Sequence, residues 1–267
     1  MLLWLYDIPT WLLFVIIVGG FSLLGVGGLL VGRTLISRTV GRAESYKGEA
    51  VGDFVAATSI LFGLIAALLT VAVWQNYTDL DTRVSQEASS LGAMYRLALE
   101  LPQPTRDELT GNIKKLTYDT MSIEWEEQRH GIKANRPDLL NAIRTTILQF
   151  KPTSSGESNL QSAVEAEFAK MYELRRHRRH DVDAGVPGAL YAVVLIGGLA
   201  TVALTWLLPV SRVRMHIVMN AIVSAMIGMI VFTIILVDHP FRGAISIGPE
   251  AFEDAFNFLM DGQYGPK

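Results

Sequence analysis

Four long apolar blocks without a charged residue constrain this chain more than any other feature of its sequence. They cover residues 11–31, 54–74, 188–208 and 217–237, and none contains Asp, Glu, Lys, Arg or His. Each has about the 20 residues that an α-helix needs to cross roughly 30 Å of hydrocarbon. Because a lipid core offers the backbone no hydrogen bonds, such blocks must fold as helices. The sequence therefore predicts an all-α membrane protein with four transmembrane helices.

The first block also has an alternative interpretation, as a secretory signal peptide. A signal peptide has a basic start, a shorter apolar core and a cleavage site of small residues. Here residues 1–10 contain no Lys or Arg, and the block runs through several glycines to Arg33. We therefore interpret it as a retained span.

The segment between the second and third blocks has the composition of a water-exposed domain. Residues 75–185 carry 15 Lys and Arg and 17 Asp and Glu, although only 18% of the whole chain is charged. Apolar residues recur here at steps of three and four, which is the period of an amphipathic helix. They are Leu80, Val84, Ala88, Leu91, Tyr95, Ala98 and Leu101. No helix breaker separates them from the second block, so we expect that span to continue into the domain as one long helix.

Three further helices are expected in this domain, which should form an extramembrane helical bundle. Thr105 and Glu108 have the spacing of a capping box, Pro137 suits a first helical turn, and residues 151–158 have a loop composition. The predicted regions are a first transmembrane pair over 1–74, the helical domain over 75–185, a second pair over 186–237, and a tail over 238–267 with a short amphipathic helix.

The sequence lacks the signatures of several kinds of chemistry. It contains no cysteine, no phosphate-binding glycine loop, no Gly-x-Ser-x-Gly and no His-Glu-x-x-His. No carboxylate lies inside an apolar block, so we expect no proton relay through the membrane core. The net charge of −3 gives no reason to expect nucleic acid as a partner. We expect neither an enzyme nor a bound cofactor.

The densest charge in the chain lies just before the third block. It contains Arg175, Arg176, Arg178 and Arg179, together with His177 and His180. The favoured interpretation is a solvated stretch beside the membrane that meets lipid phosphates. The alternative is an ion vestibule or a site for anionic lipid headgroups. The two histidines could ligate a metal, but the arginines would repel a cation, and we expect no metal site.

A second candidate site is the motif Asp238-His239-Pro240-Phe241, which follows the fourth block directly. In one interpretation Pro240 stops the helix and leaves Asp238 and His239 at the membrane interface. In the other, an acid and a histidine at the mouth of a span meet ions or sense pH.

A third candidate lies in the second block, where Thr58, Phe62, Ile65 and Leu69 share one helix face. Such a face could line a pore with an apolar constriction. Packing against lipid or against another helix is the favoured interpretation of the same pattern.

Short motifs between residues 87 and 252 form a recognisable set. They are Glu87-Ala88, Met94-Tyr95-Arg96, Leu101-Pro102-Gln103-Pro104, Glu124-Trp125, Asp238-His239-Pro240-Phe241 and Ile247-Gly248-Pro249-Glu250-Ala251-Phe252. This set resembles a bacterial membrane family of unknown function that is described as bestrophin-like. Bestrophins have the same order of two spans, a helical cytosolic domain, two spans and a cytosolic tail, and they assemble as pentameric ion channels around the second span.

The resemblance implies a homo-oligomer, a pentamer by analogy, that conducts small inorganic ions across the bilayer of the bacterial inner membrane. It places the helical domain and both termini in the cytoplasm and makes the face with Phe62, Ile65 and Leu69 a narrow neck. Basic residues beside the spans do not decide the orientation, because six lie in the short loops and seven on the domain side. No compact acidic cluster matches the calcium clasp of animal bestrophins, so calcium gating is not implied.

A different class of function is also compatible with this organisation. The chain would then be a membrane-anchored scaffold or sensor whose helical domain binds a partner and whose spans conduct nothing. The two functions differ in the second span, because only a channel needs symmetry-related copies of it around an open axis.

Overall fold

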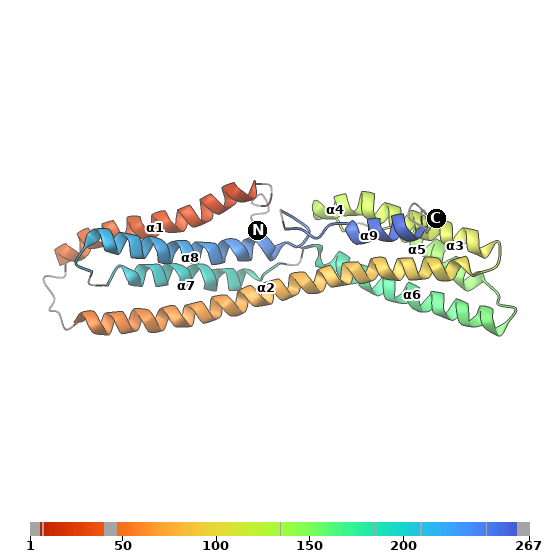
Figure 1. Cartoon of the computed structure of the whole chain (residues 1–267), viewed down its shortest axis with the longest axis horizontal. Helices are drawn as coiled ribbons and strands as arrows, with labels where there is room; N and C mark the ends of the chain where they lie inside the picture. Colours follow the sequence, from red (N-terminus) through yellow and green to blue (C-terminus); the bar gives the residue numbers. More distant parts are fainter. Residues whose placement is uncertain are drawn as a thin grey trace. The chain divides into compact units, whose positions relative to one another are not determined.

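The computed structural model describes residues 6, 8–39, 47–133, 135–183, 185–208, 210–243 and 245–260. Residues 261–267 of the predicted tail lie outside these ranges. No β-strand occurs among the described residues. Helices α1 (Thr10–Thr39), α2 (Lys47–Leu99), α7 (Gly188–Thr205) and α8 (Val213–Asp238) are long and apolar enough to cross a membrane (Figure 1). The predicted all-α fold with four transmembrane helices is confirmed.

The chain divides into two compact units. The membrane unit contains Met1–Asn76, Gly185–His239 and Gly243–Ile245, and the helical unit contains Tyr77–Ala184, Pro240–Arg242 and Ser246–Lys267. Helix α2 contributes to both units and runs without a break from its apolar half into its polar half. This confirms that the second span continues as one long helix.

In the membrane unit, α1, α7 and α8 pack closely against one another (Figure 1). Glycines on α1 allow this approach, since a Cβ atom on Gly28 would overlap the Trp206 indole and one on Gly25 would overlap the Ser224 side chain. Helix α2 adds to this group through side chains, with Phe62 and Ala66 in a small buried cluster. The face of α1 that carries Gly25 and Gly28 is thus a packing surface.

The interior of the membrane unit also contains neutral polar side chains. The Asn220 amide donates a hydrogen bond to the Thr205 hydroxyl at 2.5 Å, and His216 Nε2 lies 2.9 Å from the Thr205 carbonyl oxygen. These contacts join the end of α7 to the beginning of α8. A polar group in a lipid environment needs such a partner because no water is present to replace it.

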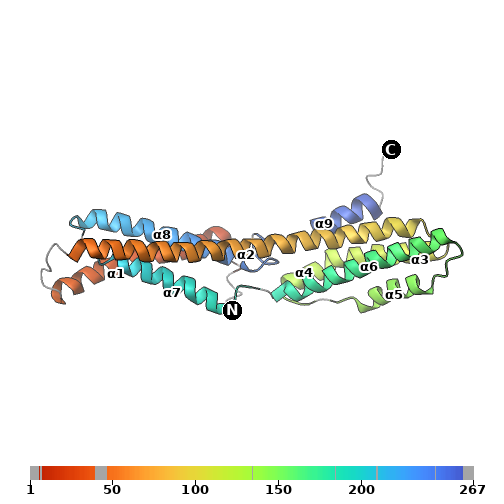
Figure 2. The same ribbon diagram turned by 90° about the horizontal axis from the view of Figure 1, so that it is seen from below.

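The helical unit is built from the polar half of α2 and several shorter helices. They are α3 (Thr105–Asp119), the π-helical turn η2 (Thr120–Glu124), α4 (Trp125–Arg129), α5 (Pro137–Gln149), α6 (Ser155–His180), the 3-10 turn η3 (Asp181–Asp183), α9 (Glu250–Asp254) and the π-helical turn η4 (Ala255–Met260). Figure 2 shows α3 and α6 lying along this half of α2. The predicted apolar stripe of α2 is buried in their common core, together with Phe241 and Phe252.

The starts of α3 and α6 differ from the sequence-based expectation, and α6 already begins at Ser155, inside the predicted loop 151–158. Helix α3 begins at Thr105 as predicted, but no side chain caps it, so the predicted capping box at Thr105 is wrong. A capping box occurs instead at Ser154, whose hydroxyl accepts a hydrogen bond from the backbone N–H of Glu157 at 3.2 Å. The Glu157 carboxylate in turn accepts the backbone N–H of Thr153 at 2.6 Å. Both segments have the same Ser/Thr-x-x-Glu spacing.

Candidate functional site

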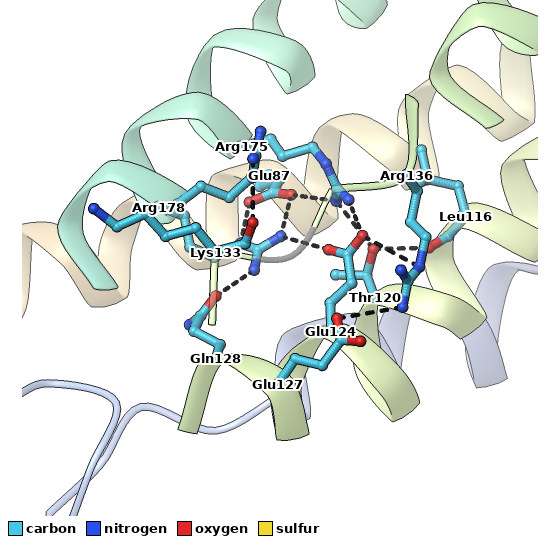
Figure 3. Close-up of polar contacts among 11 residues, drawn as sticks. Glu87, Leu116, Thr120, Glu124, Glu127, Gln128, Lys133, Arg136, Arg175 and Arg178 are labelled. Atoms are coloured by element: carbon cyan, nitrogen blue, oxygen red, sulfur yellow. Dashed lines mark hydrogen bonds and ion pairs between the residues drawn. The ribbon is translucent and has the colours of Figure 1, made fainter. Parts of the chain in front are cut away.

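The most distinctive site in the structure is a cluster of charged side chains inside the helical unit. Arg175 and Arg178 lie one turn apart on α6, point inward and are each 1% exposed. They meet Glu87 from α2 and Glu124 from the end of η2, which are equally buried (Figure 3). We call these four residues the charged core. Charged side chains are rarely buried unless they are paired, so their partners determine what the site can do.

Arg178 makes the most extensive set of contacts in the charged core. Its Nε atom donates to Glu87 Oε2 at 2.7 Å and its Nη2 atom to Glu87 Oε1 at 3.0 Å, which is the two-pronged geometry of a strong guanidinium–carboxylate pair. Its Nη1 atom donates to Gln128 Oε1 at 2.6 Å. The guanidinium also lies over the Trp125 ring, 5.1 Å from its centroid.

Arg175 joins the second carboxylate to the first. Its Nη2 atom pairs with Glu124, and its Nη1 atom donates to Thr120 Oγ1 at 3.1 Å and to Glu87 Oε1 at 3.4 Å. Two carboxylates and two guanidiniums therefore balance in charge. At the edge of the cluster, Arg136 approaches Glu124 to within 4.0 Å.

The two arginines respond differently to burial. Burial lowers the pKa of Arg175, and the neighbouring Arg178 lowers it further, while Glu124 and Glu87 act in the opposite direction. Burial also acts to lower the pKa of Arg178, but Glu87 and Glu124 outweigh it, and that pKa is raised. Arginine titrates so far above neutrality that both guanidiniums stay charged. The charged core is therefore a set of paired ionic side chains, and none of them is free to act as an acid, a base or a nucleophile.

The π-helical turn η2 positions Glu124, one of the two carboxylates of the charged core. The backbone N–H of Trp125 bonds to the Thr120 carbonyl, five residues back, so this turn is wider than an α-helical turn. Thr120, Glu124 and Gln128 thereby reach the arginines from one side. The sequence motif Glu124-Trp125 pointed to this region, but a π-turn has no compositional signature by which it could have been predicted.

The predicted environment of the arginine segment is wrong for two of its four arginines. Arg175 and Arg178 are buried and paired inside the helical unit, so they neither meet lipid phosphates nor form an open ion vestibule. Arg176 is exposed on the opposite face of α6, and Arg179 is half-buried and donates to the Lys133 carbonyl at 3.3 Å. A headgroup or vestibule role stays a prediction for Arg176 and Arg179.

The four residues of the predicted pore-lining face of α2 differ in how far they are exposed. Phe62 is 8% exposed and packs against α7, where a Cβ atom on Gly197 would lie only 2.8 Å from its ring. A side chain held inside the protomer cannot line an axis outside it, so this assignment is wrong for Phe62. Ile65 is 47% exposed, whereas Thr58 and Leu69 are half-buried. The Thr58 hydroxyl donates to the Phe54 carbonyl of its own helix at 2.8 Å.

The motif Asp238-His239-Pro240-Phe241 marks the end of α8, as the position of Pro240 predicted. Asp238 and His239 are buried, so neither lies open to ions on the single chain. Their place at the membrane interface stays a prediction. Phe241 belongs to the helical unit, where its ring packs edge to face on Trp125 with centroids 5.8 Å apart.

Comparison with known proteins adds one finding to this geometry. The family model of the bestrophin-like domain matches residues 7–252. The matched range includes all four apolar helices, the charged core and the motif at the end of α8. Comparison with curated proteins and with solved structures finds no significant match.

Proposed function

This chain belongs to the bestrophin-like family, and from that membership we propose that it forms an oligomeric ion channel in the bacterial inner membrane. Its four apolar helices make it a membrane-integral protein. In the proposed assembly, copies of the chain surround a common axis with α2 nearest to it, and small inorganic ions pass along that axis. Five copies, with the helical unit and both termini in the cytoplasm, follow the bestrophin pattern. The proposal includes no enzymatic reaction and no cofactor.

The observation that carries this proposal is the outward surface of α2. In the membrane unit, α1, α7 and α8 pack on one another, whereas α2 is attached chiefly by Phe62 and Ala66. Val55 and Val73 are also buried, but many other residues of its apolar half are exposed on the single chain, including Ile60 at 71% and Leu68 at 63%. Lipid or further copies of the chain must cover such a surface, and a helix with few contacts to its own chain is suited to contacts with other copies.

Ile65 is the best candidate for the constriction. It is the exposed member of the predicted face, and Leu69 follows it by one turn. A ring of isoleucine side chains around an axis would be wetted poorly, so ions would cross it rarely. Phe62 would support this ring from inside the protomer by holding α2 against Gly197.

Conductance of the purified protein in planar bilayers, together with its mass in the same detergent, tests the proposal. We expect an oligomeric mass, ionic current and a larger current per channel in Ile65→Ala, because the shortened side chain widens the constriction. The matched control is Ile16→Ala on α1, since Ile16 is 49% exposed and Ile65 47%. The control should conduct as the wild type does.

The other outcome supports the membrane-anchored scaffold or sensor. The helical unit exposes apolar side chains, including Leu148 at 60% and Ile132 at 54%, that a partner could cover. A monomeric mass with no current in any variant would overturn the channel proposal in favour of this function. Equal effects of Ile65→Ala and Ile16→Ala in an oligomer that conducts would overturn only the assignment of Ile65.

A further inference from the structure

The two helices that carry Glu87, Arg175 and Arg178 space their inward-facing residues in the same way, at alternating steps of four and three. On α2 the members of this series are at most 4% exposed, and they are Leu80, Val84, Glu87, Leu91, Met94 and Ala98. On α6 the members are buried or partly buried, and they are Val164, Phe168, Met171, Arg175 and Arg178. This seven-residue repeat is typical of helices that pack side by side as in a coiled coil. Every member of the two series is apolar except the three charged residues.

An apolar repeat of this kind does not by itself determine how far one helix lies along the other. A slide of about 5 Å, which is one helical turn, brings the apolar side chains of α6 opposite other apolar side chains of α2. Apolar cores tolerate such exchanges of similar side chains with little change in free energy, and they lose a unique arrangement first. Something other than apolar burial must therefore select one axial alignment of the two helices.

The buried ions distinguish one alignment from another. In the observed alignment, Arg178 donates to both carboxylate oxygens of Glu87, at 2.7 and 3.0 Å, and Arg175 Nη1 donates to Glu87 Oε1 at 3.4 Å. A slide by one turn would break the two-pronged pair, and the desolvated charges would lose their closest contact. An unpaired buried charge costs much more free energy than the exchange of one apolar contact for another.

An exposed ion pair joins nearly the same places and serves as a comparison. Arg83 Nη1, one turn before Glu87 on α2, lies 3.6 Å from Asp181 Oδ2 in η3, directly after α6. The two side chains are 43% and 24% exposed, so water and salt weaken their attraction. We therefore expect this pair to contribute little to the alignment.

We propose that the charged core sets the register of α6 on α2, so that its ions select one alignment of the two helices. Breaking the charged core and replacing it should then have different consequences. Removal of one ion leaves its partner buried and unpaired, whereas replacement of the whole group by apolar side chains removes both this penalty and the preference for one register. This inference goes beyond the proposed channel, since it concerns the helical unit of one chain and requires neither conduction nor a second copy.

Spin labels on the two helices measure their alignment directly, because the chain contains no cysteine that would have to be removed. Ser85→Cys on α2 and Ala169→Cys on α6 are exposed positions for the two labels. Double electron–electron resonance then gives the distance between the labels in the full-length protein in detergent.

The test variant replaces the buried polar group as a whole. Gln128 is included because its Oε1 atom accepts from Arg178. This apolar variant combines Glu87→Leu, Glu124→Leu, Gln128→Met, Arg175→Met and Arg178→Met. The matched control is Arg83→Gln, which removes the exposed ion pair between the same segments.

We expect a single distance between the labels in the wild-type background. The apolar variant should show a second distance, displaced by up to about 5 Å and present in at least about a tenth of the molecules. Its denaturation midpoint should be no lower than that of the wild type, because apolar replacement of a buried ion group is often neutral or stabilising. The control Arg83→Gln should keep the single wild-type distance.

Either of two results would overturn the proposal. One is a single, unchanged distance in the apolar variant, because the register would then be set without the ions. The other is a second distance in Arg83→Gln, because an exposed pair would then act as the buried ions do. If the apolar variant fails to fold, the double variant Glu87→Gln, Arg178→Met decides. It removes the two-pronged pair and must show the second distance, so a single wild-type distance there would also overturn the proposal.

Discussion

The two units of this protein bury polar side chains in different ways. Inside the membrane unit the polar groups buried where α7 meets α8 are a hydroxyl, an amide and an imidazole, which belong to Thr205, Asn220 and His216. Inside the helical unit the polar groups include the four ions of the charged core. The solvent that each helix meets before it packs explains the difference. A span must enter lipid first, where a charge is costly, whereas helices that fold from water can pair their charges as the bundle closes.

The largest effect that this comparison predicts comes from breaking the charged core. Arg178→Met removes the two-pronged partner of Glu87 and leaves that carboxylate buried with only the 3.4 Å contact to Arg175. We expect the free energy of unfolding of the helical unit to fall by about 3–5 kcal/mol. Chemical denaturation of the full-length protein in detergent, followed by circular dichroism, measures this change.

A control on the same helix makes this result specific. Arg176 is exposed one residue away from the charged core, so Arg176→Met should change stability by no more than about 0.5 kcal/mol. The additional substitution Glu87→Gln should recover part of the loss in Arg178→Met, because it removes the uncompensated charge. Equal effects of Arg178→Met and Arg176→Met would show that the charged core does not stabilise the unit.

The corresponding test in the membrane unit removes an apolar contact. Phe62→Ala opens a space beside Gly197 and Val202, in the cluster that attaches α2 to the other spans. We expect a loss of about 3 kcal/mol, measured by unfolding in mixed micelles of rising sodium dodecyl sulfate content. Leu61→Ala is the control, since Leu61 is exposed on the same helix. A rise in current without loss of stability would contradict the packing role of Phe62 and would support its assignment as a pore-lining residue.

The fold was predictable where it depends on local composition. The number of spans and the length of α2 follow from charge-free blocks and from an unbroken helical period, and neither needs knowledge of distant contacts. The burial of Arg175 and Arg178 could also have been predicted in part, from the spacing of residues along one helix. With Val164 and Met171 they form a stripe at steps of three, four and seven residues, on the buried face of α6.

The remaining features depend on partners that are distant in sequence. Arg175 pairs with residues 88 and 51 positions away, and nothing in its own segment identifies them. An apolar face such as that of Phe62 and Ile65 has the same pattern whether it meets lipid, a pore or a glycine on another helix. Ser154 and Thr105 have the same capping spacing, and only the path of the chain before each helix decides which one accepts the hydrogen bond.

The smallest expected loss of stability comes from breaking a hydrogen bond between uncharged side chains in the membrane unit. It tests the part of the comparison that the charged core does not. Asn220→Ala removes the hydrogen bond to Thr205 and the acceptor of the Ser224 hydroxyl, which lies 3.4 Å from Asn220 Oδ1, but it leaves no charge unpaired. The Thr205 hydroxyl keeps its bond to the Val202 carbonyl at 2.6 Å. Interhelical hydrogen bonds in membrane proteins average about 0.6 kcal/mol, because the separated helices also find partners. We expect a loss of about that size in the micelle experiment.

Thr233→Ala is the matched control for Asn220→Ala. The Thr233 hydroxyl is exposed and bonds only to the Met229 carbonyl of its own helix, so its removal should have no measurable effect. A loss for Asn220→Ala as large as that expected for Arg178→Met would break the comparison. The amide would then stabilise its unit as strongly as an ion pair does. Asn220 would in that case stabilise more of the membrane unit than the junction of α7 and α8. A loss near the expected value would instead show that the membrane unit is held mainly by close apolar packing, in which Gly25, Gly28 and Phe62 matter more than any single polar contact.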